Sequence, residues 1–207
     1  MFERRLPRRL GERVVRCCDV VLAALLAVLL SPLLVVAAAA VLALSGRPVL
    51  YWQERIGRGR RAFRIVKFRT MVPGADGLRP EFTDLNEAEA PLFKIRGDPR
   101  ITSVGRVLRR HGIDELPQLW NILRGDMTFV GPRPITVIED SALSPSQLAR
   151  YDRLPGITGA WQITEAGNQS VARMAEIDLA YQSTGTVRSD LKIAWRTIAI
   201  ALRGAVE

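Results

Sequence analysis

The stretch Ile113-Asp114-Glu115-Leu116-Pro117-Gln118-Leu119-Trp120-Asn121 sets two adjacent carboxylates at the start of a short apolar segment. Asp is a favoured helix N-cap, and Glu and Pro suit a first helical turn, so an ordinary helix start explains these residues taken alone. Leu116, Leu119, Trp120 and Leu123 recur at helical spacing and predict one buried face. The residues around this stretch favour a second interpretation, in which the carboxylates carry chemistry.

The two carboxylates are expected to have different roles. Asp114 at a helix start would face free backbone N–H groups and the positive end of the helix dipole, which predicts an ionised side chain. An ionised carboxylate can coordinate Mg²⁺ or attack phosphorus. Glu115 would point about 100° further round the helix. Basic residues that could bind phosphate groups occur on both sides of the pair: Lys67, Arg69, Arg109 and, in a frame fixed by Pro132 and Pro134, Arg133.

The composition predicts an anionic partner. The chain has 207 residues, a net charge of +9 and a pI near 10.6, which suits nucleic acid, anionic lipid or a phosphorylated substrate. It contains no P-loop and no Gly-rich dinucleotide motif, and its only histidine is His111, so a zinc cluster is excluded. The neighbours Cys17 and Cys18 are the only cysteines, which predicts a reducing compartment.

The segment from Val20 to Leu44 contains no charged residue and is interrupted only by Ser31 and Pro32. It exceeds both the apolar region of a signal peptide and the roughly 20 residues that cross a bilayer as a helix. Both flanks are rich in arginine, and such flanks prefer the cytoplasm. Because proline can bend a helix sharply, we expect a re-entrant membrane helix broken at Ser31-Pro32, with a kinked spanning helix as the alternative.

The rest of the chain predicts a mainly helical α+β fold. Residues 49–53 and 62–68 are expected to form a small β-hairpin, residues 70–91 a loop, and residues 102–110 a basic amphipathic helix. In a last helix, Asp190 to Arg203, the residues Leu191, Trp195, Ile198 and Leu202 share a face that suits either a bilayer surface or a core. We expect two parts: residues 1–46, the basic N-terminus and membrane helix, and residues 47–207, one catalytic domain with amphipathic interfacial helices.

Six short motifs occur in a fixed order: Lys67-Phe68-Arg69-Thr70-Met71, Asp98-Pro99-Arg100-Ile101-Thr102, Asp114-Glu115-Leu116-Pro117-Gln118-Leu119, Gly125-Asp126-Met127, Gly131-Pro132-Arg133-Pro134 and Leu154-Pro155-Gly156-Ile157-Thr158-Gly159. This ordered set resembles the bacterial monotopic phosphoglycosyl transferases, also called the bacterial sugar transferase family. The resemblance covers nearly the whole chain, including Ser31-Pro32, and the length matches the minimal catalytic form.

The resemblance implies an activity at the cytoplasmic face of the bacterial inner membrane. A sugar-1-phosphate would pass from a UDP-sugar to polyprenyl (undecaprenyl) phosphate with release of UMP, as the first membrane step of glycoconjugate assembly. Asp114 would attack the β-phosphorus to form a covalent phosphosugar–aspartyl enzyme, and Glu115 would be a metal ligand or proton acceptor beside Mg²⁺. Arg133 between Pro132 and Pro134 resembles the nucleotide-contacting element, and Asp178 a further functional carboxylate.

Several points stay open at this stage. Thr164-Glu165-Ala166-Gly167-Asn168 stands where family members often carry an Asn-Gly-Arg-like segment, which leaves the sugar undetermined. The pathway and the oligomeric state, a homodimer included, are also undetermined. One alternative is a membrane-anchored helix-turn-helix protein, although Asp114-Glu115 would then place negative charge against DNA, and we expect no nucleic-acid partner. The other alternative is an inactive membrane scaffold with the same fold.

Overall fold

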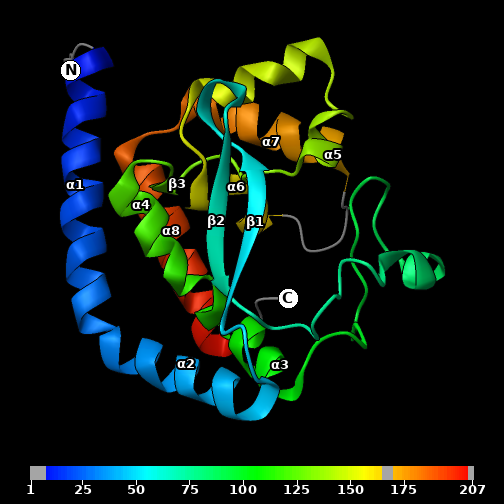
Figure 1. Cartoon of the computed structure of the whole chain (residues 1–207). Helices are drawn as coiled ribbons and strands as arrows, with labels where there is room; N and C mark the ends of the chain where they lie inside the picture. The colour runs from blue at the N-terminus through cyan, green and yellow to red at the C-terminus, as the bar shows by residue number, and fades with distance from the viewer. Residues whose placement is uncertain (1–7, 165–169, 205–207) are drawn as a thin grey trace.

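A computed structural model of the protein describes residues 8–164 and 170–204. It is mainly helical, with two small two-stranded sheets, which confirms the α+β prediction. The β-hairpin stands at the centre, and the N-terminal helices run along one side and beneath it (Figure 1). The elements in chain order are α1 (Arg8–Leu29), α2 (Ser31–Ser45), β1 (Leu50–Ile56), η1 (Arg58–Arg60), β2 (Ala62–Phe68), η2 (Arg79–Leu85), α3 (Ser103–Arg110), η3 (Ile113–Gln118), α4 (Leu119–Arg124), β3 (Thr128–Val130), α5 (Val137–Asp140), η4 (Pro145–Asp152), β4 (Gly156–Thr158), α6 (Ala160–Thr164), α7 (Val171–Thr184) and α8 (Val187–Arg203).

The apolar N-terminal run is a pair of helices. Among the described residues no single helix is long and apolar enough to cross a bilayer, whereas Arg13–Leu29 and Ser31–Ser45 qualify together, with a 61° bend between them. The break lies at Leu30, one residue before the predicted Ser31-Pro32, because proline lacks an N–H and therefore fits the first turn of α2. The Ser31 hydroxyl donates to the Val28 carbonyl, 2.7 Å away, and so satisfies one group at the end of α1.

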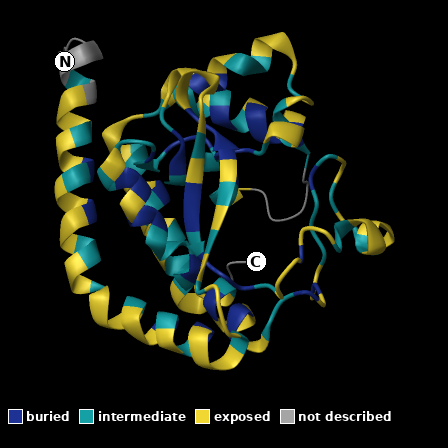
Figure 2. Cartoon of the chain, viewed as in Figure 1, coloured by how far each residue is buried: buried dark blue, intermediate teal, exposed yellow. Residues whose placement is uncertain are grey.

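Both arms of this bent pair pack against the rest of the protein. Ala23 of α1 belongs to a buried cluster with Ile65 of β2 and Ile122 of α4. Val41 of α2 belongs to a second cluster, with Phe68 and with Val104 and Leu108 of α3. The outer surfaces of both helices stay exposed (Figure 2), and next to the bend Val28 and Leu29 are 76% and 72% exposed. The pair therefore has one face on the protein and one apolar face that nothing in the described chain covers.

The β-hairpin is as predicted, with β1 continuing three residues beyond the expected end at Gln53. The antiparallel register pairs Tyr51 with Lys67, Gln53 with Ile65 and Arg55 with Phe63. Directly opposite residues point to the same side of a sheet. One face of the hairpin therefore presents Tyr51, Gln53, Arg55, Ile65 and Lys67 together.

The segment that carries Asp114 differs from the predicted helix. Gly112, with a φ of 64°, precedes it as the cap residue, and Ile113–Gln118 form a 3-10 helix before α4 begins. A 3-10 helix has three residues per turn, which displaces the expected 3.6-residue pattern. Trp120 is consequently 53% exposed rather than part of the buried face, while Leu119 and Ile122 are buried.

Asn121 fixes this segment to the hairpin. Its Oδ1 accepts a hydrogen bond from the Val66 N–H at 3.2 Å, and its Nδ2 donates to the Arg64 carbonyl at 2.7 Å. The Asn121 carbonyl also accepts from the N–H groups of Gly125, Asp126 and Met127. The buried side chain of this one residue thus sets the distance between β2 and the residues that begin with Asp114.

The C-terminal helix α8 exposes its apolar face. Leu191, Trp195, Ile198 and Leu202 are between 53% and 78% exposed, and Ile193 is its only buried residue. The interpretation that this face packs in a core is therefore wrong for the described part of the chain. That the face lies on a bilayer surface stays an expectation.

Candidate active site

Asp114 is a buried carboxylate, only 7% exposed, in the first turn of η3. From the sequence, the helix start was expected to keep Asp114 ionised, but burial has the larger effect on its pKa. Burial first, and the charge of Glu115 second, raise the pKa of Asp114 to about 6, against the opposing charges of Lys67 and Arg109. The carboxylate form still predominates at neutral pH, with a basicity higher than that of an exposed aspartate.

Glu115 is paired with Lys67. The Lys67 Nζ lies 2.5 Å from Glu115 Oε1, and both side chains are partly exposed. Burial tends to raise the pKa of Glu115, but the charges of Lys67, Arg133 and Arg55 outweigh it and hold the pKa below its usual range. The two neighbouring carboxylates therefore differ in basicity, and their different roles stay a prediction.

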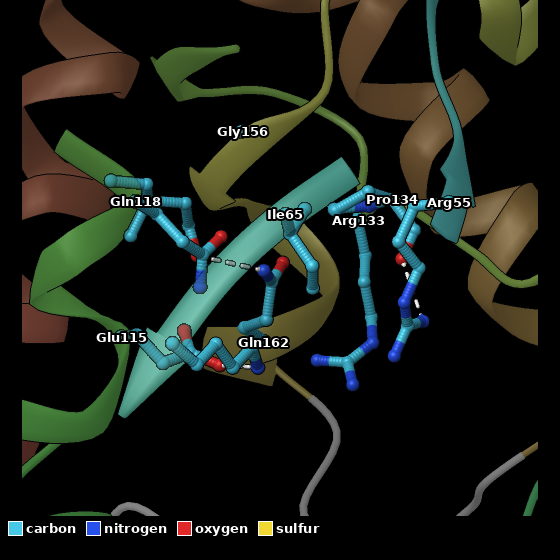
Figure 3. A pocket seen from close by; sticks show the side chains of 10 residues that line it. Arg55, Ile65, Glu115, Gln118, Arg133, Pro134, Gly156 and Gln162 are labelled. Atoms are coloured by element: carbon cyan, nitrogen blue, oxygen red, sulfur yellow. Dashed lines mark hydrogen bonds and ion pairs between the residues drawn. The ribbon is translucent and has the colours of Figure 1, made fainter. Parts of the chain in front are cut away.

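A hollow of about 260 Å³, open to solvent, lies beside Glu115 and Lys67, and Asp114 is not among the residues that line it. Figure 3 shows Arg55 and Arg133 on one side of it and Glu115 and Gln118 on the other. The polar side chains that line it are Arg55, Lys67, Glu115, Gln118, Arg133 and Gln162. Three cations and one carboxylate in so small a volume form a site suited to an anion such as a diphosphate.

Arg133 is held in place from several directions. Its guanidinium lies over the Trp161 ring, 5.5 Å from the ring centre. The loop that carries it pairs with the β4 segment: the Gly131 N–H donates to the Thr158 carbonyl at 2.9 Å, and the Gly156 N–H donates to the Pro132 carbonyl at 3.0 Å. A Cβ at Gly131 would lie 2.4 Å from the Leu154 carbonyl oxygen, so this approach requires glycine. Pro132 and Pro134 are buried and complete the rigid frame.

Arg55 was not among the residues singled out from the sequence. Its Nη1 donates to the Pro134 carbonyl at 3.1 Å and lies 3.5 Å from Glu139 Oε2, which ties β1 to the Arg133 loop. Burial first, and the charge of Arg133 second, lower the pKa of Arg55 to about 10. The hairpin register could have identified this residue, because Arg55 shares a face with Lys67.

Arg69 and Arg109 lie outside the residues that line this hollow. Arg69 Nη2 donates to the carbonyls of Ser45 and Gly46, at 2.5 and 2.8 Å, and its Nε donates to the Pro48 carbonyl at 2.6 Å. The structure thus places Arg69 against the end of the bent helix pair. Arg109 Nε donates to Thr70 Oγ1 at 2.9 Å, and its charge acts on Asp114.

Asp178 is connected to the Arg133 loop through Arg150. Its carboxylate Oδ2 is 2.7 Å from Nη2 of Arg150, and both side chains are 1% exposed. The same Arg150 nitrogen donates to the Arg133 carbonyl at 2.8 Å. Burial raises the pKa of Asp178, while the charge of Arg150 acts in the opposite direction. Arg150, which the sequence patterns did not single out, connects Asp178 to the site.

Asp114 and Glu115 are the carboxylates of the site that could hold Mg²⁺. Among the described residues no group of three or more His, Cys, Asp or Glu side chains could hold a metal. Mg²⁺ commonly keeps several waters and is bound through one or two carboxylates plus substrate phosphates, so Asp114 and Glu115 fit this ion. Residues 165–168 of the segment that departs from the family pattern, which leaves the sugar undetermined, lie outside the described residues.

Comparison with known proteins identifies the family. The family model described as bacterial sugar transferase matches residues 10–204. The chain is 43% identical over 201 residues to the UDP-glucose:undecaprenyl-phosphate glucose-1-phosphate transferase of Caulobacter vibrioides, covering 93% of this chain and 71% of that protein. It is 39% identical over 196 residues to the exopolysaccharide production protein ExoY of Rhizobium meliloti, covering 92% and 86%. It is 39% identical over 160 residues to the galactosyl transferase CpsE of Streptococcus agalactiae, where it spans only 36% of the relative. The chain belongs to the bacterial sugar transferase family.

Proposed function

We propose that the protein transfers a sugar-1-phosphate from a UDP-sugar to undecaprenyl phosphate, releasing UMP, in the synthesis of a bacterial polysaccharide. One relative is named for glucose-1-phosphate transfer to undecaprenyl phosphate and another for exopolysaccharide production, which supports both the reaction and its context. The observation that carries the proposal is the position of Asp114: a buried carboxylate, next in sequence to the glutamate of a hollow lined by three cations.

The reaction proceeds in two displacements at one phosphorus. A carboxylate oxygen of Asp114 attacks the β-phosphorus of the UDP-sugar, and the bond from that phosphorus to the bridging oxygen of UMP breaks. An oxygen of undecaprenyl phosphate then attacks the same phosphorus and displaces Asp114, which gives the lipid diphosphate sugar. A covalent intermediate lets a soluble donor and a lipid acceptor react in turn at a single site.

The cations support the negative charge that develops during both displacements. Arg133 and Arg55 offer guanidinium groups to the diphosphate, and Lys67 lies closest to the Asp114–Glu115 pair. Asp178 acts through Arg150, which holds the Arg133 carbonyl and so positions the Arg133 loop. Mg²⁺ held by Asp114 and Glu115 would neutralise part of the phosphate charge.

We further propose that the protein is monotopic, with the bent helix pair in the membrane and this site at the inner face of the bacterial plasma membrane. Both arms of the bent helix pair contact the folded body, through Ala23 on α1 and Val41 on α2. These contacts support a helix pair that enters and leaves the membrane by the same face. In a spanning helix, the half beyond the bilayer centre would lie too far from the folded body to contact it. The exposed apolar face of α8 would lie in the lipid headgroup region.

The two alternatives fare differently. A helix-turn-helix would need a recognition helix that begins at Asp114, but Asp114 is buried and Ile113–Gln118 is a short 3-10 segment, so the DNA-binding interpretation is wrong. An inactive scaffold is tested by enzymology: detergent-purified protein is incubated with UDP-sugars, Mg²⁺ and undecaprenyl phosphate while UMP is followed. We expect turnover by the wild type and by the control Asp84→Asn, an exposed aspartate in η2, and none by Asp114→Asn.

The covalent step has its own test. Enzyme incubated with a donor labelled at the β-phosphate, in the absence of lipid acceptor, should retain label on the peptide that contains Asp114. Product formation without any label on that side chain would remove Asp114 as the nucleophile. The topology is tested by cysteine labelling within residues 2–7 in a Cys17→Ser/Cys18→Ser background. Labelling from outside intact cells would contradict the monotopic arrangement.

A further inference from the structure

We propose that Gln162 accepts a hydrogen bond from a hydroxyl group of the transferred sugar and helps to select that sugar. This inference rests on the proposed function and adds a specificity residue to it. Gln162 lies in α6, directly after the β4 strand and the Gly159 turn, and it lines the same hollow as Glu115 and Lys67. Figure 3 shows it directed into this space, between Glu115 and Arg133 in the view drawn.

The carboxamide of Gln162 is left half satisfied. Its Nε2 donates to the Ile157 carbonyl, 3.3 Å away. Its Oε1 is buried and has no hydrogen-bond partner within the described part of the chain. A buried acceptor without a donor costs free energy, so such an atom in a binding site marks a place where a ligand donor fits.

The orientation of the amide follows from its neighbour. If the group were turned by 180°, Oε1 would face the Ile157 carbonyl oxygen, and two acceptors would repel each other. The contact with Ile157 therefore keeps Nε2 on this carbonyl and leaves Oε1, which packs beside Gly159, without a donor. Close packing adds to this, because a Cβ at Gly159 would lie only 2.8 Å from Oε1.

The chemistry of the free atom limits what it can bind. Oε1 can only accept, and the phosphate oxygens of a nucleotide sugar at neutral pH also only accept. Phosphate groups are matched instead by Lys67, Arg55 and Arg133 in the same hollow. The donors of the substrate are the hydroxyl groups of the sugar and ribose and the N–H of the base. Gln162 shares its hollow with Glu115, the neighbour of the residue that bonds to the sugar-bearing phosphorus, so we assign its partner to the sugar.

The experiment compares donors within each enzyme variant. The best UDP-sugar is first found by screening for UMP release, and its singly deoxygenated analogues are then measured. For the wild type we expect one analogue to lose roughly tenfold or more in kcat/KM, because it leaves Oε1 unpaired. In Gln162→Met, which removes the acceptor, the ratio between parent and that analogue should fall to within about twofold of one. Ratios for the other analogues should not change.

Ratios within one variant cancel differences in the amount of folded enzyme. Gln162→Glu keeps an acceptor but loses the hydrogen bond to Ile157, so it should retain discrimination against the same analogue. If Gln162 had a purely structural role, Gln162→Glu and Gln162→Met would show the same kcat/KM ratio. If a variant lacks turnover, the same ratio is taken from donor dissociation constants in an Asp114→Asn background. Unchanged ratios in Gln162→Met, or an equal loss on all analogues, would overturn the inference. Failure of the proposed function would appear separately, as absence of UMP release by the wild type with every donor.

Discussion

Lys67 Nζ and Glu115 Oε1 lie 2.5 Å apart, and this ion pair joins the β2 strand to the 3-10 segment that carries Asp114. Lys67→Gln removes the charge that most strongly lowers the pKa of Glu115 and also opposes the raised pKa of Asp114. We expect UMP release to fall by about 100-fold, since a cation near the developing phosphate charge is lost. The matched control is Lys192→Gln on the exposed surface of α8, which should stay within about twofold of wild type; equal losses in both variants would contradict a specific role of Lys67.

The titration of Asp114 tests its burial and the proposed metal together. In protein without added divalent cation, the Asp114 carboxyl group should titrate near pH 6, because burial and Glu115 favour the protonated form. Glu115→Gln removes the second cause and should shift the midpoint downward. The resonance is followed by NMR of protein labelled at the aspartate carboxyl carbon, with Asp114→Asn as assignment. Mg²⁺ should also lower the midpoint, and no effect of Mg²⁺ would count against ligation by this carboxylate.

The buried pair of Asp178 and Arg150 should matter far more for stability than the exposed pair on the same helix. Asp178→Asn leaves the Arg150 charge uncompensated at 1% exposure, so we expect the free energy of unfolding to fall by about 3–5 kcal/mol. Glu176→Gln breaks the contact between Glu176 and Arg173, which are 60% and 47% exposed. This change should lower the free energy of unfolding by less than about 1 kcal/mol. Thermal unfolding in detergent measures both, and comparable losses would show that Asp178 is not held as described.

Arg69 offers a choice between two roles. As a phosphate ligand, the role first predicted for it, its loss would weaken donor binding in folded protein. As the residue that holds the carbonyls of Ser45, Gly46 and Pro48, its loss should loosen the end of α2. We expect Arg69→Met to lower the unfolding temperature and to speed hydrogen exchange around residues 45–48, with little change in KM for the donor among molecules that remain folded. A raised KM at unchanged stability would favour the phosphate role.

The sequence predicted those elements whose pattern is local. The alternation in residues 62–68 predicted the hairpin, and the uncharged run with its proline predicted a broken apolar helix, because both follow from side-chain periodicity and backbone chemistry. The predicted start of the helix at Asp114 was wrong. An aspartate that could cap a helix is buried here because its segment packs against β2, which lies far from it in the sequence, and Gly112 takes the cap position.

The contacts of three arginines could not be predicted from the neighbouring sequence. Nothing in the neighbouring residues indicates that Arg69 meets backbone carbonyls, that Arg150 is the largest fully buried side chain, or that Arg55 reaches the Arg133 loop. These positions depend on contacts between distant segments. Pairing of the two hairpin strands would have identified Arg55, but the partners of Arg69 and Arg150 emerge only with the three-dimensional fold.

In the monotopic arrangement proposed above, the 61° bend at Leu30 determines in which membranes the protein can work. A straight spanning segment must match the thickness of the hydrocarbon layer, and a mismatch is relieved by tilting or by local deformation of the lipid. A pair of helices that returns to the face by which it entered meets no such requirement, since it touches only one leaflet. Activity in vesicles of short-chain and long-chain lipids should therefore be nearly equal, and adaptation of the host to temperature by altered acyl chains would leave this step of assembly unaffected.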